Sequence, residues 1–180
     1  MSELFEDPDL LAAVEALLFS AAAPVPVAAL AQALGDRDPQ VVTRALEALE
    51  QRCDAERRGV VVRRVAGGWQ LRTHPRFSAA ILRLIGARPQ KLSRAALEVL
   101  AIVAYEQPVT RGRVEQVRGV GCGRVIKNLL ERGLVRTAGR RNEPGRPLQY
   151  ATTRTFLEVY GLPGLSSLPT IEEKDALDES

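Results

Sequence analysis

Residues 97–119, which read LEVLAIVAYEQPVTRGRVEQVRG, decide the fold because they join an apolar helix to a tight turn and a second helix. One face of the first helix is apolar, and Ile102 and Val103 make the opposite side apolar too, which predicts a buried helix. The residues of the first face are Leu97, Leu100, Ala101 and Ala104. Pro108 ends this helix, because proline cannot donate the backbone hydrogen bond that continuation needs.

The chain after Pro108 carries the start and stop signals of a second helix. Thr110 is its predicted N-cap and Gly119 its predicted end. Val114 and Val117, three residues apart, are expected to point into the core. A helix-turn-helix is therefore predicted.

Residues 121–153 predict a third helix followed by a β-hairpin. Ile126, Leu129 and Leu130 lie at helical spacing before Gly133, which favours an amphipathic helix that ends there. The segments 134–137 (LVRT) and 148–153 (LQYATT) are typical of paired strands. The hairpin supplies a wing to the helix-turn-helix.

The first half of the chain repeats this order. A third helix is expected to start at Pro39, and two strands are expected at 60–65 and 69–73. Glycines join these strands, because glycine tolerates the positive φ of a tight turn. At a constant offset of 84 residues, Pro24, Val25, Leu30 and Gly35 correspond to Pro108, Val109, Val114 and Gly119. We therefore expect an α+β, predominantly helical fold of two tandem winged-helix domains, residues 1–88 and 89–165. Residues 166–180 are expected to form a disordered acidic tail.

Charge is distributed unevenly along the chain. Residues 1–90 hold 11 Lys+Arg and 11 Asp+Glu, residues 91–165 hold 13 and 6, and residues 166–180 hold 1 and 5. A helix-turn-helix domain with a net charge of +7 favours a nucleic-acid partner. Arg140, Arg141 and Arg146 on the second wing are candidates for weak contacts to a duplex backbone, with a solvated loop as the equal alternative.

Several classes of protein are disfavoured. No apolar run reaches the ~18 residues of a membrane span, and the acidic start lacks the basic region of a secretory signal, so a cytoplasmic protein is expected. Cys53 and Cys122 are far apart and His74 is the single histidine, so we expect no disulfide framework, metal site or cofactor. Residues 119–123 lack the Lys-Ser/Thr of a P-loop. No nucleophile, base or metal set suggests an enzyme.

Several motifs, in order, resemble the segregation and condensation protein B family of the bacterial SMC–kleisin complex. They are LSRAALEVLAIVAYEQPVTRGRVEQVRGV at 92–120, LLERGLV at 129–135, GRRNEPGRP at 139–147, YATT at 150–153, FLEVYGL at 156–162 and LPTIEE at 168–173. EALLFSA at 15–21 extends the resemblance to the first half. Glu106 departs from the family, whose members usually carry a basic residue before Gln-Pro.

The resemblance implies a non-enzymatic subunit in chromosome condensation and segregation, associated with the nucleoid. Such proteins form homodimers through the first domain and bind the kleisin, ScpA, and through it the SMC ATPase. Tyr105, Gln107 and Arg111 are the residues near the hinge best able to offer polar or amphipathic contacts to a kleisin peptide. The alternative is a winged-helix transcriptional regulator, which would bind duplex DNA with strong sequence preference. At most weak, nonspecific DNA binding is expected.

Overall fold

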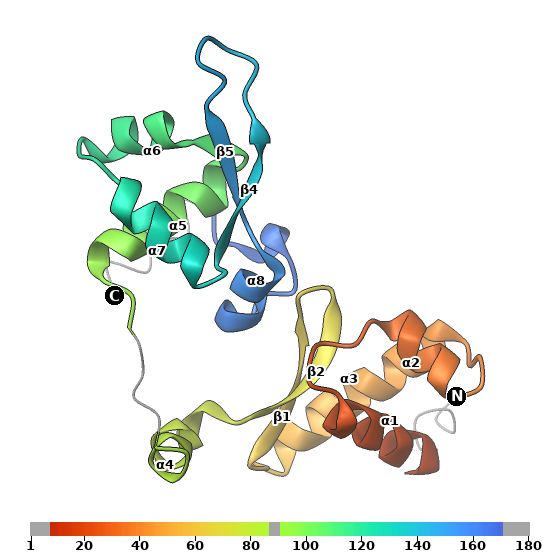
Figure 1. Ribbon diagram of the computed structural model, residues 1–180. Coiled ribbons are helices and arrows are strands. Elements are labelled where there is room, and N and C mark those ends of the chain that lie inside the picture. The colour runs from red at the N-terminus through yellow and green to blue at the C-terminus, as the bar shows by residue number, and fades with distance from the viewer. Residues whose placement is uncertain (1–7, 87–90, 171–180) are drawn as a thin grey trace. The chain divides into compact units, whose positions relative to one another are not determined.

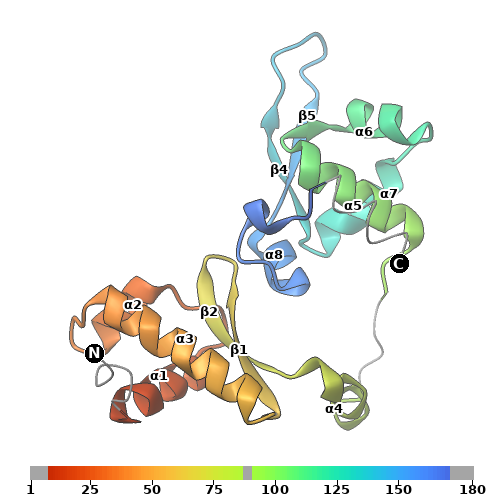
Figure 2. The ribbon, with the colours of Figure 1, turned by 180° about the vertical axis from the view of Figure 1, so that it is seen from behind.

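The computed structural model describes residues 8–86 and 91–170, and it divides the chain into two compact units (Figures 1 and 2). The first unit comprises Met1–Arg88 together with Gly161–Ser180, and the second is Pro89–Tyr160. Both mix helices with a small antiparallel sheet, as the predicted α+β class requires. No helix within the described ranges is long and apolar enough to cross a membrane.

Three helices form the core of the first unit: α1 (Pro8–Ser20), α2 (Val27–Ala33) and α3 (Pro39–Ala55). The α3 helix starts where Asp38 accepts a hydrogen bond from the Gln40 backbone N–H at 2.8 Å, because this carboxylate satisfies a donor that the first turn leaves unpaired. The largest fully buried side chains of these helices are Val14, Leu18, Leu30, Val42, Leu46 and Leu49.

A hairpin follows, formed by β1 (Val60–Val65) and β2 (Gly68–Thr73). Its two-residue turn places Ala66 and Gly67 at φ 48° and 75°, the left-handed conformation that such a turn needs. Val25 joins the hairpin from the loop before α2, exchanging two backbone hydrogen bonds of 2.8 Å with Trp69. Figures 1 and 2 show α1, α2 and α3 on one side of this hairpin. Beyond it lie a 3₁₀ turn, η1 (Pro75–Phe77), and α4 (Ser78–Leu84).

The chain returns to the first unit after the second is complete. We call residues 161–170 the return segment; it contains a 3₁₀ turn, η2 (Leu165–Ser167). The N–H groups of Ala66 and Gly67 at the hairpin turn donate to the carbonyl oxygens of Leu162 and Pro163, each at 2.8 Å. The structure thus groups residues 161–165 with the first unit, whereas the sequence places them in the second domain. Residues 171–180 of the expected tail lie outside the described residues.

The second unit has the predicted helix-turn-helix. Its helices are α5 (Arg94–Glu106), α6 (Arg111–Arg118) and α7 (Gly123–Glu131). Thr110 caps α6 by accepting a hydrogen bond from the Arg113 backbone N–H, and Gly119 ends it at φ 72°, which confirms both predictions. The side chain of Ser93 caps α5 in the same way.

A three-stranded sheet completes the second unit. Its strands are β3 (Val109–Thr110), β4 (Val135–Arg140) and β5 (Leu148–Thr152), in the order β3-β5-β4. A register shift between Thr137 and Gly139 bulges β4. The last helix, α8 (Arg154–Tyr160), follows β5. Figures 1 and 2 show α5, α6 and α7 on one side of the β4–β5 hairpin.

Two predictions about the inward faces are wrong. Leu100 and Ala104 of the predicted face are buried, but Leu97, in the first turn of α5, is 47% exposed because the buried face there is centred on Ala96 and Val99. Val117 is also exposed, whereas Val114 is fully buried, so α6 turns only a narrow stripe inward. The helix α5 is therefore covered on one side and open on the other.

Candidate protein-interaction site

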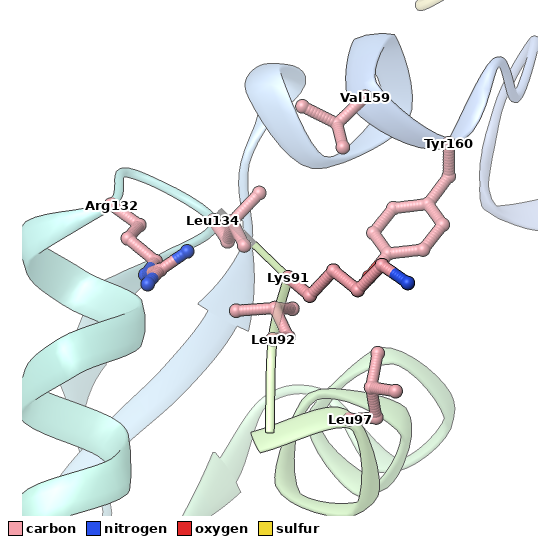
Figure 3. A pocket seen from close by; sticks show the side chains of 7 residues that line it. All are labelled: Lys91, Leu92, Leu97, Arg132, Leu134, Val159 and Tyr160. Carbon is pink, nitrogen blue, oxygen red and sulfur yellow. The ribbon is translucent and has the colours of Figure 1, made fainter. Parts of the chain in front are cut away.

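A pocket of about 520 Å³ opens on the second unit (Figure 3). It is formed where the start of α5, the end of α7 and the end of α8 meet. Figure 3 shows Leu92 and Leu134 between α5, which carries Leu97, and α8. The residues that line it are Lys91, Leu92, Leu97, Arg132, Leu134, Val159 and Tyr160.

Most of this lining is apolar, and part of it is open to solvent, whereas Leu134 is buried. Val159 is 59% exposed and Leu97 47%, although both are aliphatic. Phe156, one turn earlier on α8, is buried and packs on the Tyr160 ring at 5.0 Å between centroids, which fixes the aromatic wall. Burial raises the pKa of the Tyr160 phenol above its ordinary value of 10.0, so the phenol is uncharged at neutral pH. An exposed apolar surface of this kind is typical of a contact site.

The charged residues of the lining are both cations. Figure 3 shows Arg132 at one side of the pocket and the Lys91 amine at the other. All six carboxylates of the second unit already make ion pairs with other cations. Glu98 contacts Arg94 and Arg118, and the remaining pairs are Glu106–Arg113, Glu115–Arg111, Glu131–Lys127, Glu143–Arg141 and Glu158–Arg154. The pocket therefore combines an apolar floor with positive charge at its edges.

The three partner-contact candidates lie elsewhere on the second unit. Tyr105 is exposed near the end of α5. Gln107 is half-buried, and its side-chain oxygen accepts hydrogen bonds from the Thr152 N–H and hydroxyl, each at 2.9 Å. Its side-chain nitrogen donates to the Ala104 carbonyl oxygen at 2.9 Å. Gln107 thus joins α5 to β5.

Arg111 takes part in an ion-pair network at the start of α6. Its Nε donates to Glu115 Oε1 at 2.7 Å, and the same oxygen accepts the Cys122 backbone N–H at 2.9 Å. These bonds, that from Cys122 above all, lower the pKa of Glu115 below its ordinary value of 4.5. Glu115 thereby holds the turn between α6 and α7 in place.

Glu106, the departure from the family pattern, has a partner within this chain. Arg113 donates to both of its carboxylate oxygens, at 2.7 and 3.1 Å. The hydrogen bond to Glu106 is the main reason why the pKa of Arg113 is raised above its ordinary value. The acidic residue is thus matched by a cation on the neighbouring helix α6.

The three wing arginines are exposed, and two of them have partners on the wing. The Arg140 guanidinium donates to the Arg146 carbonyl oxygen at 2.9 Å, and Arg141 contacts Glu143 at 3.0 Å. Arg146 sits at φ 41°, so its backbone is held in the left-handed region. These contacts shape the loop between β4 and β5.

No catalytic arrangement is evident in the described residues. His74 accepts a hydrogen bond from the Arg76 N–H through Nδ1 at 3.2 Å, a local cap of η1. Cys53 and Cys122 are buried, and burial raises the pKa of both thiols, so neither is a ready nucleophile. Within residues 8–86 and 91–170, no group of acidic, histidine or cysteine side chains could hold a metal ion.

Exposed apolar surface rimmed by charged residues is typical of an interaction site. A model of the segregation and condensation complex subunit ScpB matches residues 12–171, and the chain belongs to this family. It is 50% identical over 165 residues to segregation and condensation protein B of Syntrophotalea carbinolica, covering 92% of this chain and 83% of the relative. It is 46% identical over 177 residues to that of Moorella thermoacetica, covering 98% and 90%. Membership assigns the chain to chromosome segregation and condensation.

Solved structures are similar in sequence as well. The crystal structure of ScpB from Mycobacterium tuberculosis is 39% identical, with 87% of this chain and 98% of that chain covered and a TM-score of 0.43.

Proposed function

We propose that this chain is a non-catalytic subunit of a cytoplasmic, nucleoid-associated SMC–kleisin complex, and that it acts by forming a homodimer and binding the kleisin ScpA. The exposed apolar pocket of the second unit is the observation that carries the proposal. Family membership supports the partnership with ScpA and, through it, with the SMC ATPase.

In this proposal each unit is a winged-helix domain. Both units have three helices followed by a hairpin, and both bring a residue from the first turn into the sheet. Val25 pairs with Trp69, and Val109, 84 residues later, pairs with Tyr150. Two residues at the offset found in the sequence thus both pair with the second strand of a hairpin, although their partners lie 81 residues apart.

The first unit supplies the dimer contact in this proposal. Phe19 and Leu84 are 81% and 86% exposed, and Ile85 is exposed beside Leu84. The helix α4 has no fully buried residue, and its apolar side chains Ile81 and Leu82 are only half-buried. A second copy of the unit would remove these side chains from water.

The second unit binds the kleisin in this proposal, through its apolar pocket. Tyr105 and Arg111 stay candidates for additional contacts, because both are exposed. Gln107 is a weaker candidate, since its polar atoms are already bonded to Ala104 and Thr152.

Light scattering on the full chain, alone and with purified ScpA, tests both the proposed homodimer and the proposed binding of ScpA. We expect a dimer that binds ScpA, and we expect Leu84→Asp to shift the dimer toward monomer. Val120→Asp is the matched control, because Val120 is an exposed aliphatic residue of the second unit. If the parent chain is monomeric, the proposed homodimer is wrong. If the chain does not bind ScpA, the proposed binding of the kleisin is wrong.

Weak DNA binding is a subsidiary proposal, supported by the +7 charge of residues 91–165. Within the described part of the chain Arg140 and Arg146 make no ion pair, whereas Glu143 partly neutralises Arg141. Tight, sequence-selective duplex binding at physiological salt would favour the transcriptional regulator instead.

A further inference from the structure

We propose that Arg76 is a positioning residue that fixes the helix α4 and so presents Leu84 and Ile85 to a second copy of the chain. This inference rests on the proposed function, in which the exposed side chains at the end of α4 belong to the dimer contact. It adds how that helix is held in place, which decides whether a second copy meets an ordered surface.

The helix α4 is held mainly by the turn that leads into it. No other helix or strand of the described residues contacts α4 as extensively as η1 does. Figures 1 and 2 show α4 apart from α1 and α2, at the end of the segment that follows β2. Ser78 follows η1 directly, and its hydroxyl donates to the Pro75 carbonyl oxygen, so η1 and α4 are joined with no residue between them. The placement of α4 therefore depends on where η1 is attached.

The side chain of Arg76 attaches η1 to the turn in which α3 ends. Its guanidinium donates to the carbonyl oxygens of Arg57 and Arg58, the latter at 3.1 Å. These two residues close α3, since the Arg58 N–H donates back to the Cys53 carbonyl oxygen at 3.1 Å. Carbonyl oxygens at the end of a helix lack partners within it and carry partial negative charge, so a cation that donates to them is favoured.

Two backbone-side contacts bring η1 close to the same turn. The His74 N–H donates to the Gly59 carbonyl oxygen at 2.9 Å, and the Phe77 ring lies 3.7 Å from the point where a Cβ on Gly59 would stand. The Arg76 guanidinium lies over the Phe77 ring, 4.7 Å from its centroid, which holds the arginine in its place. Because proline and phenylalanine have no side-chain donor, Arg76 supplies the side-chain hydrogen bonds from η1 to the end of α3.

The position of Arg76 at the surface separates this role from a role in the core. Arg76 is exposed, whereas the core of the first unit is built from the buried side chains of α1, α2 and α3. Loss of its guanidinium should release α4 without unfolding those helices. A released α4 would have to be ordered again when two copies associate, and this entropic cost would weaken the dimer.

Hydrogen exchange and sedimentation equilibrium on the full chain test the inference. Arg76→Met keeps the aliphatic stem over Phe77 but removes the donors. We expect it to raise the dimer dissociation constant about tenfold. In the Leu84→Asp background, where the dimer contact cannot protect α4, it should speed amide exchange of residues 79–85 about tenfold and leave the Trp69 urea transition in place.

Two further variants show whether the hydrogen bonds are responsible. Arg76→Lys should recover most of both losses, because its amine can also donate to the two carbonyl oxygens. Arg83→Met is the matched control, since Arg83 is exposed on α4 and its side chain has no hydrogen bond or ion pair within residues 8–86 and 91–170. Equal losses in Arg76→Met and Arg83→Met would refute the positioning role, because they would assign the effect to charge alone.

The outcomes distinguish this inference from the proposed dimer contact. If Leu84→Asp gives a monomer but Arg76→Met changes neither the dissociation constant nor the exchange of α4, the dimer contact stands and the role of Arg76 is wrong. If Arg76→Met speeds the exchange of α4 while both variants dimerise like the parent chain, Arg76 fixes α4 but the dimer contact lies elsewhere, which overturns its placement and the presentation of Leu84 together.

Discussion

Replacing Gln107 with methionine should destabilise the second unit while leaving the first unchanged. Methionine keeps the volume of the side chain but removes the acceptor for the N–H and hydroxyl of Thr152, which is 7% exposed. A buried donor left without an acceptor costs about 1–3 kcal/mol. The hydroxyl can rotate to another acceptor whereas the N–H cannot, so one donor is left unpaired and we expect a loss of about 1–3 kcal/mol in the free energy of unfolding.

Urea unfolding with two probes measures this loss. Trp69, the single tryptophan, reports the first unit by fluorescence, whereas far-UV circular dichroism reports both. Gln107→Met should shift the dichroism transition to lower urea and leave the Trp69 transition in place. Gln149→Met is the matched control, because its side chain makes one exposed hydrogen bond of 3.2 Å to Pro108 and should cost about 0.5 kcal/mol. If Gln107→Met has the same urea midpoint as the parent chain, the structural role of Gln107 is refuted. If, in addition, its affinity for ScpA is lower than that of the parent chain, Gln107 is a contact residue instead.

Three further outcomes are expected. Gly68→Ala should lower the stability of the first unit by about 1–3 kcal/mol by Trp69 fluorescence, since its Cβ would lie 2.8 Å from the Val25 carbonyl and break two hydrogen bonds; an unshifted transition would contradict this. Glu115→Gln should lower the melting temperature at pH 7, and the deficit should shrink as the pH falls below 4.5, because a depressed pKa stabilises the fold above the ordinary 4.5 and that contribution is lost as pH falls through the folded pKa; a deficit that does not shrink in acid would refute it. Duplex DNA titrated over a salt series should bind weakly, and its affinity should depend less steeply on salt concentration after Arg140, Arg141 and Arg146 are changed to Gln. An unchanged salt dependence would show that these arginines do not contact the DNA.

The signals that the sequence predicted correctly are local ones. Thr110 and Gly119 bound α6 because capping and a positive φ depend on neighbouring backbone groups alone. The hairpin at Gly67 follows from the same kind of constraint. These features need no knowledge of the tertiary structure.

The pocket and the return segment depend on tertiary contacts, and the sequence reasoning missed both. The sequence predicts Leu97 in the core, because apolar character alone does not show which face of α5 is covered. Val159 and Tyr160 follow the buried Phe156, and their spacing alone does not distinguish a pocket wall from core. The apolar residues on both sides of α5 are the one signal that the sequence carries for an uncovered face, and the sequence analysis interpreted them as full burial of the helix. Tyr105 and Arg111, on either side of the turn at Pro108, are candidates for kleisin contacts because of their polar groups, and their role stays a prediction.

The return segment also has a consequence for the order in which the protein is made. The hairpin turn of the first unit emerges from the ribosome with Ala66 and Gly67, but their acceptors on Leu162 and Pro163 are synthesised almost a hundred residues later. At typical rates of translation of about 5–20 residues per second, the nascent hairpin waits on the order of 5–20 s for its last backbone partners. During that interval two N–H donors are open to water and to any extended chain nearby. The first unit is begun first and finished last, so its final hydrogen bonds form only after the whole second unit has been synthesised.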